Sequence, residues 1–459
     1  MSCSKYLLRM FRIARWSSFH DVAKLEVYIE WMRRLKGMDF TVFRVEGDGK
    51  VERYYVPLIS SNGIPEGYPR DRAYKLNSRY FLEAEYFKEY TWIIFQCELD
   101  CDELIVKGKL DLNDEFKVKP LNVSTTNCLS YIGSDTVSYV LKSYRKIPRV
   151  NIEAKMLWKL TRRGFRNIPR LYLQLIHRKY GPLSIYLEYV DSLGDGGYPF
   201  AGNFINYLEG REPVDVKLAR ELGKTTAYLH LNLVDHYDDF FKPESISSLD
   251  VGLWIKRIKG IYLKFRETIP CSGDRLHSIL DLFELYLDRI KARTHQDYHL
   301  AQMLYARDGR FVILDFEGEP NRSDEERLLK EPFLRDIACL LRSFDYLIAF
   351  TLAFKNGISL RDACNILLNK EKRIFNWYRE VSLNLLESYI KTLGPKTEEA
   401  TGFDRGTLED EIVQLLAPWM LEKAIYELKY EHDYRPENII VPLTGIKMLL
   451  EGTHPIYSL

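Results

Sequence analysis

The segments HQDYHLAQ (295–302) and FVILDFEGEP (311–320) decide how the chain folds. Asp297 lies in a polar stretch five residues before Gln302. Asp315 follows the apolar run FVIL, which predicts a strand, thirteen residues after Gln302. A carboxylate at a strand end and a nearby amide carbonyl are oxygen ligands of the kind that Mg²⁺ uses when it also bridges phosphates. The pattern therefore predicts a metal-dependent site that handles phosphate groups.

These residues match the set that phosphoryl transfer needs, with Asp297 to accept a hydroxyl proton and with Gln302 and Asp315 on the metal. The spacing corresponds to the kinase catalytic loop H-R-D-x-x-x-x-N, and D-F-E-G stands where kinases carry D-F-G. Either aspartate alone could be a helix cap or a strand-end residue, but their order and spacing together predict a kinase-like site. His295 and His299 are spaced as zinc ligands on a helix would be. Without a third ligand, His295 is expected to pack inside and brace the loop.

A kinase-like site also needs a lysine on an upstream strand. Lys142, at the end of a hairpin predicted over Ser130–Leu141, is the candidate, since its ammonium could reach the α- and β-phosphates. Glu153 opens the next predicted helix and could pair with it. No G-x-G-x-x-G precedes this lysine. The segment from Glu188 to Val190, at the end of a predicted strand, fits a hinge whose backbone groups bind adenine.

Composition bounds the class of protein. The 459 residues include 66 Lys and Arg against 65 Asp and Glu, so the formal charge is +1, and 46% are hydrophobic. This balance argues against a nucleic-acid partner and permits a large core divided among two or three domains. The chain has no run of 18 apolar residues that would span a membrane. Seven scattered cysteines, an odd number, are typical of a reducing compartment, so we expect a cytoplasmic protein.

The first twenty residues are basic and carry an apolar face. Lys5, Arg9, Arg12 and Arg15 precede the first acid, Asp21. The pattern fits either a transit-type amphipathic helix or an ordinary first helix that caps the fold, and we adopt the second interpretation.

Hydrophobic periodicity changes along the chain. Alternating runs from Thr41 to Leu112, among them Thr91–Phe95, predict antiparallel strands. A helix is predicted from the N-cap Asn151 to Gly164, followed by strands at 171–175 and 183–190. After Asp191 helices dominate, with a surface loop at 394–406. The predicted helices are 216–234, 253–268, 274–290, 333–354, 360–390 and 407–430.

Several motifs resemble those of the bacterial maltokinases, which are relatives of the aminoglycoside phosphotransferases with a eukaryotic-protein-kinase-like fold. The motifs are H-x-D-Y-H-L-x-Q at 295–302, D-F-E-G-E-P at 315–320, L-R-D-I-A with L-R-S-F-D-Y at 334–346, and K-A-x-Y-E-x-x-Y-E with R-P at 423–436. The resemblance extends roughly from Asn127 to the C-terminus and is weaker over the first 120 residues.

The resemblance implies an α+β, bilobal, protein-kinase-like fold. Its parts would be an N-terminal β-rich cap subdomain (1–115), an intermediate ATP-binding sheet subdomain (116–190) and a mostly helical C-lobe (191–459) with the catalytic loop and the sugar site. It also implies transfer of the γ-phosphate of Mg-ATP to a sugar hydroxyl, which in maltokinases converts maltose to maltose 1-phosphate. The partner would be a small-molecule sugar, without nucleic acid or membrane, and the protein a monomer or dimer.

By this match Asp297 is the catalytic base, Gln302 and Asp315 hold Mg²⁺, and Lys142 reaches the phosphates of ATP. Asp336 ties the catalytic loop to the following helix. The other assignments are Asn127, Glu153, Glu188 and Val190 for the nucleotide, Glu427, Tyr430 and Arg435 for the sugar, and His295 for support of the loop.

The sequence departs from the family at positions that could set sugar choice or nucleotide grip. Gln296 stands where the family usually has Gly, and Lys155 where it often has an acid. Three alternatives therefore stay open: an aminosugar kinase such as a glucosamine kinase, another small-molecule phosphotransferase of this fold, and a non-catalytic nucleotide- or sugar-binding protein.

Overall fold

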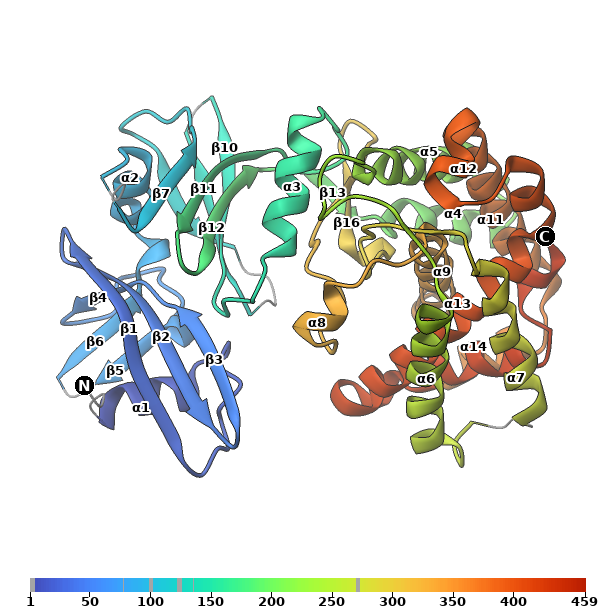
Figure 1. The fold of residues 1–459 in the computed structure, drawn as a ribbon, viewed down its shortest axis with the longest axis horizontal. Coiled ribbons are helices and arrows are strands. Elements are labelled where there is room, and N and C mark those ends of the chain that lie inside the picture. The colour runs from blue at the N-terminus through green and yellow to red at the C-terminus, as the bar shows by residue number, and fades with distance from the viewer. Residues whose placement is uncertain (1–4, 77, 99–101, 122–125, 135, 270–272) are drawn as a thin grey trace. The chain divides into compact units, whose positions relative to one another are not determined.

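The structure is a computed structural model that describes residues 5–76, 78–98, 102–121, 126–134, 136–269 and 273–459. The chain forms two compact units (Figure 1). Unit 1 comprises Met1–Trp158 and Pro169–Tyr189, and unit 2 comprises Lys159–Ile168 and Val190–Leu459. Sheets dominate unit 1 and helices dominate unit 2, so the predicted α+β class, with N-terminal sheets and a helical C-terminal region, is confirmed. The division into three subdomains stays a prediction.

The first sheet of unit 1 is antiparallel, with the strand order β1-β2-β4-β6-β5 and with β3 beside β2. Four of its strands lie within the stretch from Thr41 to Leu112 where alternation predicted them, whereas β1 precedes that stretch and β2 begins three residues before it. They are β1 (Leu25–Leu35), β2 (Met38–Gly47), β3 (Lys50–Tyr55), β4 (Leu58–Ser61), β5 (Ala73–Leu76) and β6 (Arg79–Glu83).

The second sheet of unit 1 has the order β7-β11-β12-β10-β9-β8. The predicted hairpin is formed by β9 and β10, and the two later strands by β11 and β12. The sequence predicts the turn of this hairpin from Gly133 to Asp135, of which Gly133 and Ser134 are described and Asp135 lies outside the described residues. The strands are β7 (Leu104–Gly108), β8 (Lys117–Pro120), β9 (Cys128–Gly133), β10 (Ser138–Ser143), β11 (Leu171–His177) and β12 (Gly181–Glu188).

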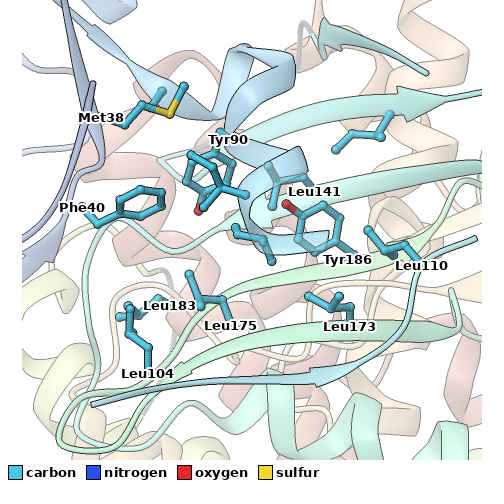
Figure 2. Packing of buried hydrophobic residues seen from close by; sticks show 14 of the residues in the cluster. Met38, Phe40, Tyr90, Leu104, Leu110, Leu141, Leu173, Leu175, Leu183 and Tyr186 are labelled. Atoms are coloured by element: carbon cyan, nitrogen blue, oxygen red, sulfur yellow. The ribbon is translucent and has the colours of Figure 1, made fainter. Parts of the chain in front are cut away.

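The two sheets of unit 1 share one apolar core, in which Met38 and Phe40 of the first sheet lie near Leu141 and Tyr186 of the second (Figure 2). Helix α2 (Lys88–Phe95) contributes Tyr90 to the same core.

The prediction of a strand over Thr91–Phe95 is wrong, because these residues belong to helix α2. The buried apolar side chains Tyr90, Ile93 and Ile94 are spaced by three and four residues, which is the helical period. A short apolar run fits a strand and a buried helix equally well in the sequence.

Helix α1 (Lys5–Ile13) covers part of the first sheet. Met10 and Phe11 are fully buried in a second cluster with Phe43 and Tyr54 of that sheet. The apolar face of this N-terminal helix is therefore used inside unit 1, as expected of a helix that caps the fold.

Helix α3 (Ile152–Arg162) begins where the sequence predicts. The Asn151 side chain accepts a hydrogen bond from the Ala154 N–H at 2.9 Å, which caps the helix, and Gly164 has φ +70° just after its end.

Unit 2 is built mainly from helices, and those predicted over 216–234, 333–354 and 407–430 match within four residues. The helix predicted over 253–268 begins at Ser248, the one predicted over 274–290 ends at Asp281, and the helices at 198–208 and 440–450 were not predicted. The hairpin of β16 (Met303–Ala306) and β17 (Phe311–Ile313) connects the first motif segment to Asp315, and its strand β16 pairs with β13 (Ser192–Asp195). The principal helices are α4 (Tyr198–Leu208), α5 (Val216–Leu233), α6 (Ser248–Phe265), α7 (Gly273–Asp281), α9 (Phe333–Asn356), α10 (Leu360–Leu368), α11 (Lys372–Leu393), α13 (Arg405–Tyr434) and α14 (Ile440–Leu450).

Two helices replace the single one predicted over 360–390. The break lies at Lys370, whose φ is +56°, and the Glu371 side chain caps α11 by accepting from the Ile374 N–H at 2.8 Å. The 394–406 gap is also not a plain surface loop, because it contains α12 (Thr397–Thr401) with its apolar side buried. Gly402 is required there, since a Cβ would overlap the backbone of Arg289 and Ile290.

Helix α9 has the length and apolar composition to cross a membrane, the one such case among the described residues. It nevertheless packs against α13 and α10, and 56% of its most apolar window is buried inside unit 2. It also carries the buried charged residues Arg335, Asp336 and Arg342. The helix therefore serves as a core element of unit 2.

The described part of the chain contains four cysteines, and all four are free thiols. They are Cys97, Cys128, Cys339 and Cys364. The other three, Cys3, Cys101 and Cys271, lie outside the described residues.

Candidate active site

Asp297 lies in unit 2 on the loop before the 3₁₀ turn Leu300–Gln302, and it is 7% exposed. Its Oδ1 accepts a hydrogen bond from the Lys423 ammonium at 3.0 Å, and the His299 imidazole lies 3.6 Å from the same oxygen. Lys423 belongs to α13 and is itself 4% exposed. A carboxylate and an ammonium thus meet in a nearly dry environment.

The charge state of Asp297 follows from these neighbours. Burial alone would raise its pKa, but the ammonium of Lys423 and the imidazole of His299 outweigh burial and hold the pKa well below its usual range. The same pairing raises the pKa of Lys423 well above its usual value despite burial. Asp297 is therefore an ionised carboxylate, oriented and ready to accept a hydrogen bond from a hydroxyl.

Glu319, the second glutamate of the D-F-E-G-E-P motif, shares Lys423 with Asp297. Its Oε1 accepts from the Lys423 ammonium at 2.8 Å, and its Oε2 accepts from Arg335 at 2.8 Å and from Arg322. Glu319 has no exposed surface. Burial would raise the pKa of Glu319, but the guanidinium groups and Lys423 hold it below its usual value. Glu319 consequently fixes the ammonium that orients Asp297.

A larger ion-pair network extends from this pair into the core of unit 2. Arg335 of α9 binds Glu319, and Glu422 of α13 receives hydrogen bonds from Arg322 at 2.5 Å and from Arg335 at 3.4 Å. The network balances four acids against four bases, so it buries no net charge. Its members are Asp297, Glu319, Glu331, Glu422, Arg257, Arg322, Arg335 and Lys423.

Asp336 holds the loop that carries Asp297. Its two carboxylate oxygens accept from the backbone N–H groups of His295 at 2.7 Å and of Gln296 at 3.0 Å. The His295 ring, also buried, bonds the Leu314 carbonyl through Nε2 at 2.7 Å, next to Asp315. The two residues thus connect the loop to helix α9 and to the end of strand β17.

Gln296 has φ +70°, a conformation that favours glycine. This is the position at which the resemblance noted in the sequence leads us to expect Gly, and its positive φ gives a physical reason for that expectation. The Gln296 side chain offsets the strain by donating to the Leu329 carbonyl at 2.8 Å.

Gln302 and Asp315 lie side by side. The Gln302 amide donates to the Asp315 carboxylate at 3.3 Å, and both side chains are half-buried. Asp315 has φ +55°, a strained conformation for a residue with a Cβ, which directs its carboxylate at the strand end. An amide oxygen and a carboxylate at one place are donors that fit a Mg²⁺ ion retaining several waters.

In unit 1, the predicted Lys142–Glu153 pair forms. The Lys142 ammonium lies 2.9 Å from Glu153 Oε1 and 2.8 Å from Oε2, and Tyr144 donates to the same carboxylate at 2.8 Å. Lys142 is 8% exposed and is the penultimate residue of β10, one of the two central strands of the second sheet. The pair therefore holds the ammonium in one place on a rigid strand.

Asn127, also predicted for the nucleotide, lies beside a buried charged cluster of unit 1. Its side-chain carbonyl accepts from the Arg145 N–H at 3.3 Å. The Arg145 guanidinium bonds Glu83 and Glu85, both without exposed surface. The cluster links β6 of the first sheet to the end of β10 in the second.

The predicted hinge residues lie at the end of β12. Glu188 is the last residue of the strand, and its backbone N–H bonds the Arg170 carbonyl at 2.8 Å. The strand ends two residues earlier than predicted, and Val190 begins the second part of unit 2.

Glu427, Tyr430 and Arg435 lie on or just after α13. Glu427 is 9% exposed and accepts from Arg342 at 2.7 Å, while burial, its largest influence, raises its pKa. Arg435 lies 4.9 Å above the Tyr430 ring. Glu431 accepts from Arg435 at 3.0 Å.

The structure thus brings Asp297, Gln302, Asp315, His295 and Asp336 together in unit 2, with Glu427 on the helix that supplies Lys423. Lys142, Glu153, Asn127 and Glu188 lie in unit 1.

Sequence reasoning missed three residues of the site. Lys423 and Glu319 belong to the sequence motifs, but neither these two residues nor Arg342 received a predicted role. One signal was available for Lys423, since the charged residues Glu422, Lys423 and Glu427 interrupt the apolar residues at 415–428 and charged residues must be paired when they are buried.

Comparison with known proteins places this geometry in context. No protein-family model matches the chain. A glucosamine kinase of Streptacidiphilus jiangxiensis is 26% identical over 315 residues, which is 65% of this chain and 65% of that protein. The matched region is thus less than two thirds of the relative's length.

Solved structures match more of the chain. A glucosamine kinase in crystal form B has a TM-score of 0.71 and 17% identity, with 98% of both chains covered. A glucosamine kinase in complex with glucosamine, ADP and inorganic phosphate has a TM-score of 0.68 and 16% identity, with 98% of this chain and 100% of that chain covered. The protein therefore has the fold of these kinases.

Proposed function

We propose that the protein is an ATP-dependent carbohydrate kinase that transfers the γ-phosphate of ATP to a hydroxyl of an aminosugar, glucosamine. The main support for this proposal is the hydrogen bond between Asp297 and Lys423 of α13. Glu427 and Glu431 follow Lys423 at four-residue intervals on the same face of that helix. The relatives compared above are glucosamine kinases, which favours the aminosugar over maltose as the acceptor.

In this proposal Asp297 binds the acceptor hydroxyl and takes its proton. Its low pKa makes it a weak base, so its main contribution is to orient the hydroxyl oxygen toward the phosphate. Lys423 and Glu319 keep the carboxylate in one position, and Asp336 holds the loop backbone. Catalysis then rests on positioning and charge, as is usual for phosphoryl transfer.

The nucleotide side of the proposal uses Lys142 as the ligand of the ATP phosphates, positioned by Glu153. Gln302 and Asp315 would hold Mg²⁺, which when bound neutralises charge on the phosphates. Asn127, Glu188 and Val190 stay proposed contacts of the nucleotide.

Maltose is the second candidate acceptor, and one observation favours it besides the sequence resemblance. Tyr430 and the exposed Tyr434 form a pair of rings along α13, with centroids 5.0 Å apart, next to the buried Tyr426. Such a pair suits stacking on a sugar ring.

The test is a kinase assay with a panel of acceptors: glucosamine, maltose, glucose and an aminoglycoside. We expect ATP-dependent phosphorylation of glucosamine, identified by phosphorus NMR of the product. Asp297→Asn should lower kcat by about 10²–10⁴-fold without unfolding the protein. Asp308→Asn, which alters an exposed aspartate paired with Arg310, is the matched control. Phosphorylation of maltose but not glucosamine would establish the second candidate, and ATP consumption by Asp297→Asn at the wild-type rate would reject the role of Asp297.

A further inference from the structure

The carboxylate of Glu427 is held from one side. Arg342 of α9 donates from Nη2 at 2.7 Å and from Nε at 3.2 Å, and both bonds go to Oε2. Among the described residues Oε1 has no hydrogen-bond partner. Glu427 lies one helical turn from Lys423, the partner of Asp297, so Oε1 is available close to the proposed reaction centre.

Arg342 is in turn fixed on its other side. Its guanidinium, which has no exposed surface, forms an ion pair with Asp345 one turn along α9. Helix α14 also packs against it, because a Cβ at Gly445 would overlap the guanidinium. These contacts therefore restrict the guanidinium of Arg342 to one orientation.

Asp345 is held by the C-terminal segment. His454, whose side chain is fully buried, lies with Nε2 3.0 Å from Asp345 Oδ2, and its Nδ1 accepts from the Ile456 N–H at 3.2 Å. A ring nitrogen that accepts carries no proton, so His454 is the neutral tautomer that donates from Nε2. The four side chains then sum to one negative charge, from two carboxylates and one guanidinium.

We propose that Arg342, Asp345 and His454 form a buried relay that positions the Glu427 carboxylate to bind the ammonium group of the acceptor aminosugar. The inference rests on the proposed function, because it specifies how the proposed acceptor is recognised. The surplus negative charge and the open Oε1 complement a cation, whereas a neutral sugar gains only hydrogen bonds there. Arg342, Asp345 and His454 are positioning residues, and Glu427 is the group that touches the acceptor.

Two variants disturb the relay without touching Glu427. His454→Gln removes the ring that holds Asp345, and Gly445→Ala places a methyl group against the guanidinium of Arg342. Each should raise the KM for glucosamine by about tenfold, while kcat and the KM for ATP stay at their wild-type values. A merely structural role would move both KM values and kcat together.

The matched control is His177→Gln. His177 is also buried, and its Nδ1 accepts from the backbone N–H two residues later, as in His454, but its Nε2 has no hydrogen-bond partner in the described part of the chain. This variant should keep the wild-type KM for glucosamine. Melting temperatures of all variants show whether each one folds.

The outcomes separate the relay from the proposed function. A wild-type protein that phosphorylates no aminosugar refutes the function and the relay with it. An active protein whose folded variants keep the wild-type KM for glucosamine overturns the relay alone. If neither variant folds, a crystal structure of the wild type with glucosamine decides, since an amino group bound away from Glu427 Oε1 also overturns the relay.

Discussion

Replacing Lys423 by Met would test the central pair of the site. The substitution keeps the length of the side chain but leaves Asp297 and Glu319 buried without the ammonium that both contact, at 3.0 Å and 2.8 Å. Removing one partner of a buried, hydrogen-bonded ion pair costs about 3–5 kcal/mol of folding free energy. Glu319 keeps Arg322 and Arg335, so Asp297 bears most of this cost.

The loss should depend on pH. In the wild type the pKa values of Asp297 and Glu319 lie below their usual range, so their contribution to stability is present above the unfolded-state value of about 4 and is lost as the pH falls through the folded-state values. Without Lys423, His299 is the remaining neighbour named above that opposes burial, so the pKa of Asp297 should rise. As the pH falls, Asp297 of the variant takes up a proton at a higher pH than Asp297 of the wild type, and this removes the unpaired buried charge. The difference in the free energy of unfolding between the two proteins therefore shrinks on acidification.

Urea unfolding followed by far-ultraviolet circular dichroism, at pH values between about 7 and 4, measures this difference. Lys429→Met is the matched control, because Lys429 lies on the same helix in a surface pair with Asp433 at 2.8 Å. It should cost no more than about 0.5 kcal/mol at any pH. A Lys423→Met loss below about 1 kcal/mol at neutral pH, or one that does not vary with pH, would refute the reasoning.

Two further predictions concern the loop and the metal. Gln296→Gly should be more stable than Gln296→Ala by about 1 kcal/mol, since both variants lose the hydrogen bond to the Leu329 carbonyl but only Ala retains the strain of φ +70°. The midpoints of urea unfolding of the two variants measure this difference. The opposite order of stability would contradict the backbone role assigned to position 296. Gln302→Ala should raise the Mg²⁺ concentration for half-maximal kinase activity by about tenfold, whereas the exposed Gln414→Ala should not. An unchanged Mg²⁺ titration for Gln302→Ala would exclude Gln302 as a ligand.

Local patterns in the sequence were sufficient for most of the fold. Asn151 and Gly164 bound α3 because capping and chain reversal depend on residues within a few positions. The same holds for the hairpin of β9 and β10. Helix α2 was missed, because the burial that makes its apolar run helical comes from sheets elsewhere in unit 1.

Spacing along the chain was sufficient to predict that Gln302 and Asp315 lie together, whereas the roles of Asp297, Gln302 and Asp315 stay predictions. The candidate site was not predictable where partners are distant in the chain. Lys423 contacts Asp297 across 126 residues, and Arg342 contacts Glu427 across 85. The sequence gives the residue types of such pairs but not which acid meets which base, since that depends on how α9 and α13 pack.

The even spacing of Lys423, Glu427 and Glu431 along α13 has a consequence for how this protein could diverge from its relatives. Each residue turns an α-helix by about 100°, so inserting or deleting one residue just ahead of Lys423 would rotate Lys423 away from Asp297 and Glu427 away from Arg342 at once. Substitutions at these positions can alter acceptor choice one step at a time, but a change in helix length cannot. We expect acceptor preferences among proteins of this fold to vary by exchange of residues in α13, at constant length between Trp419 and Glu431.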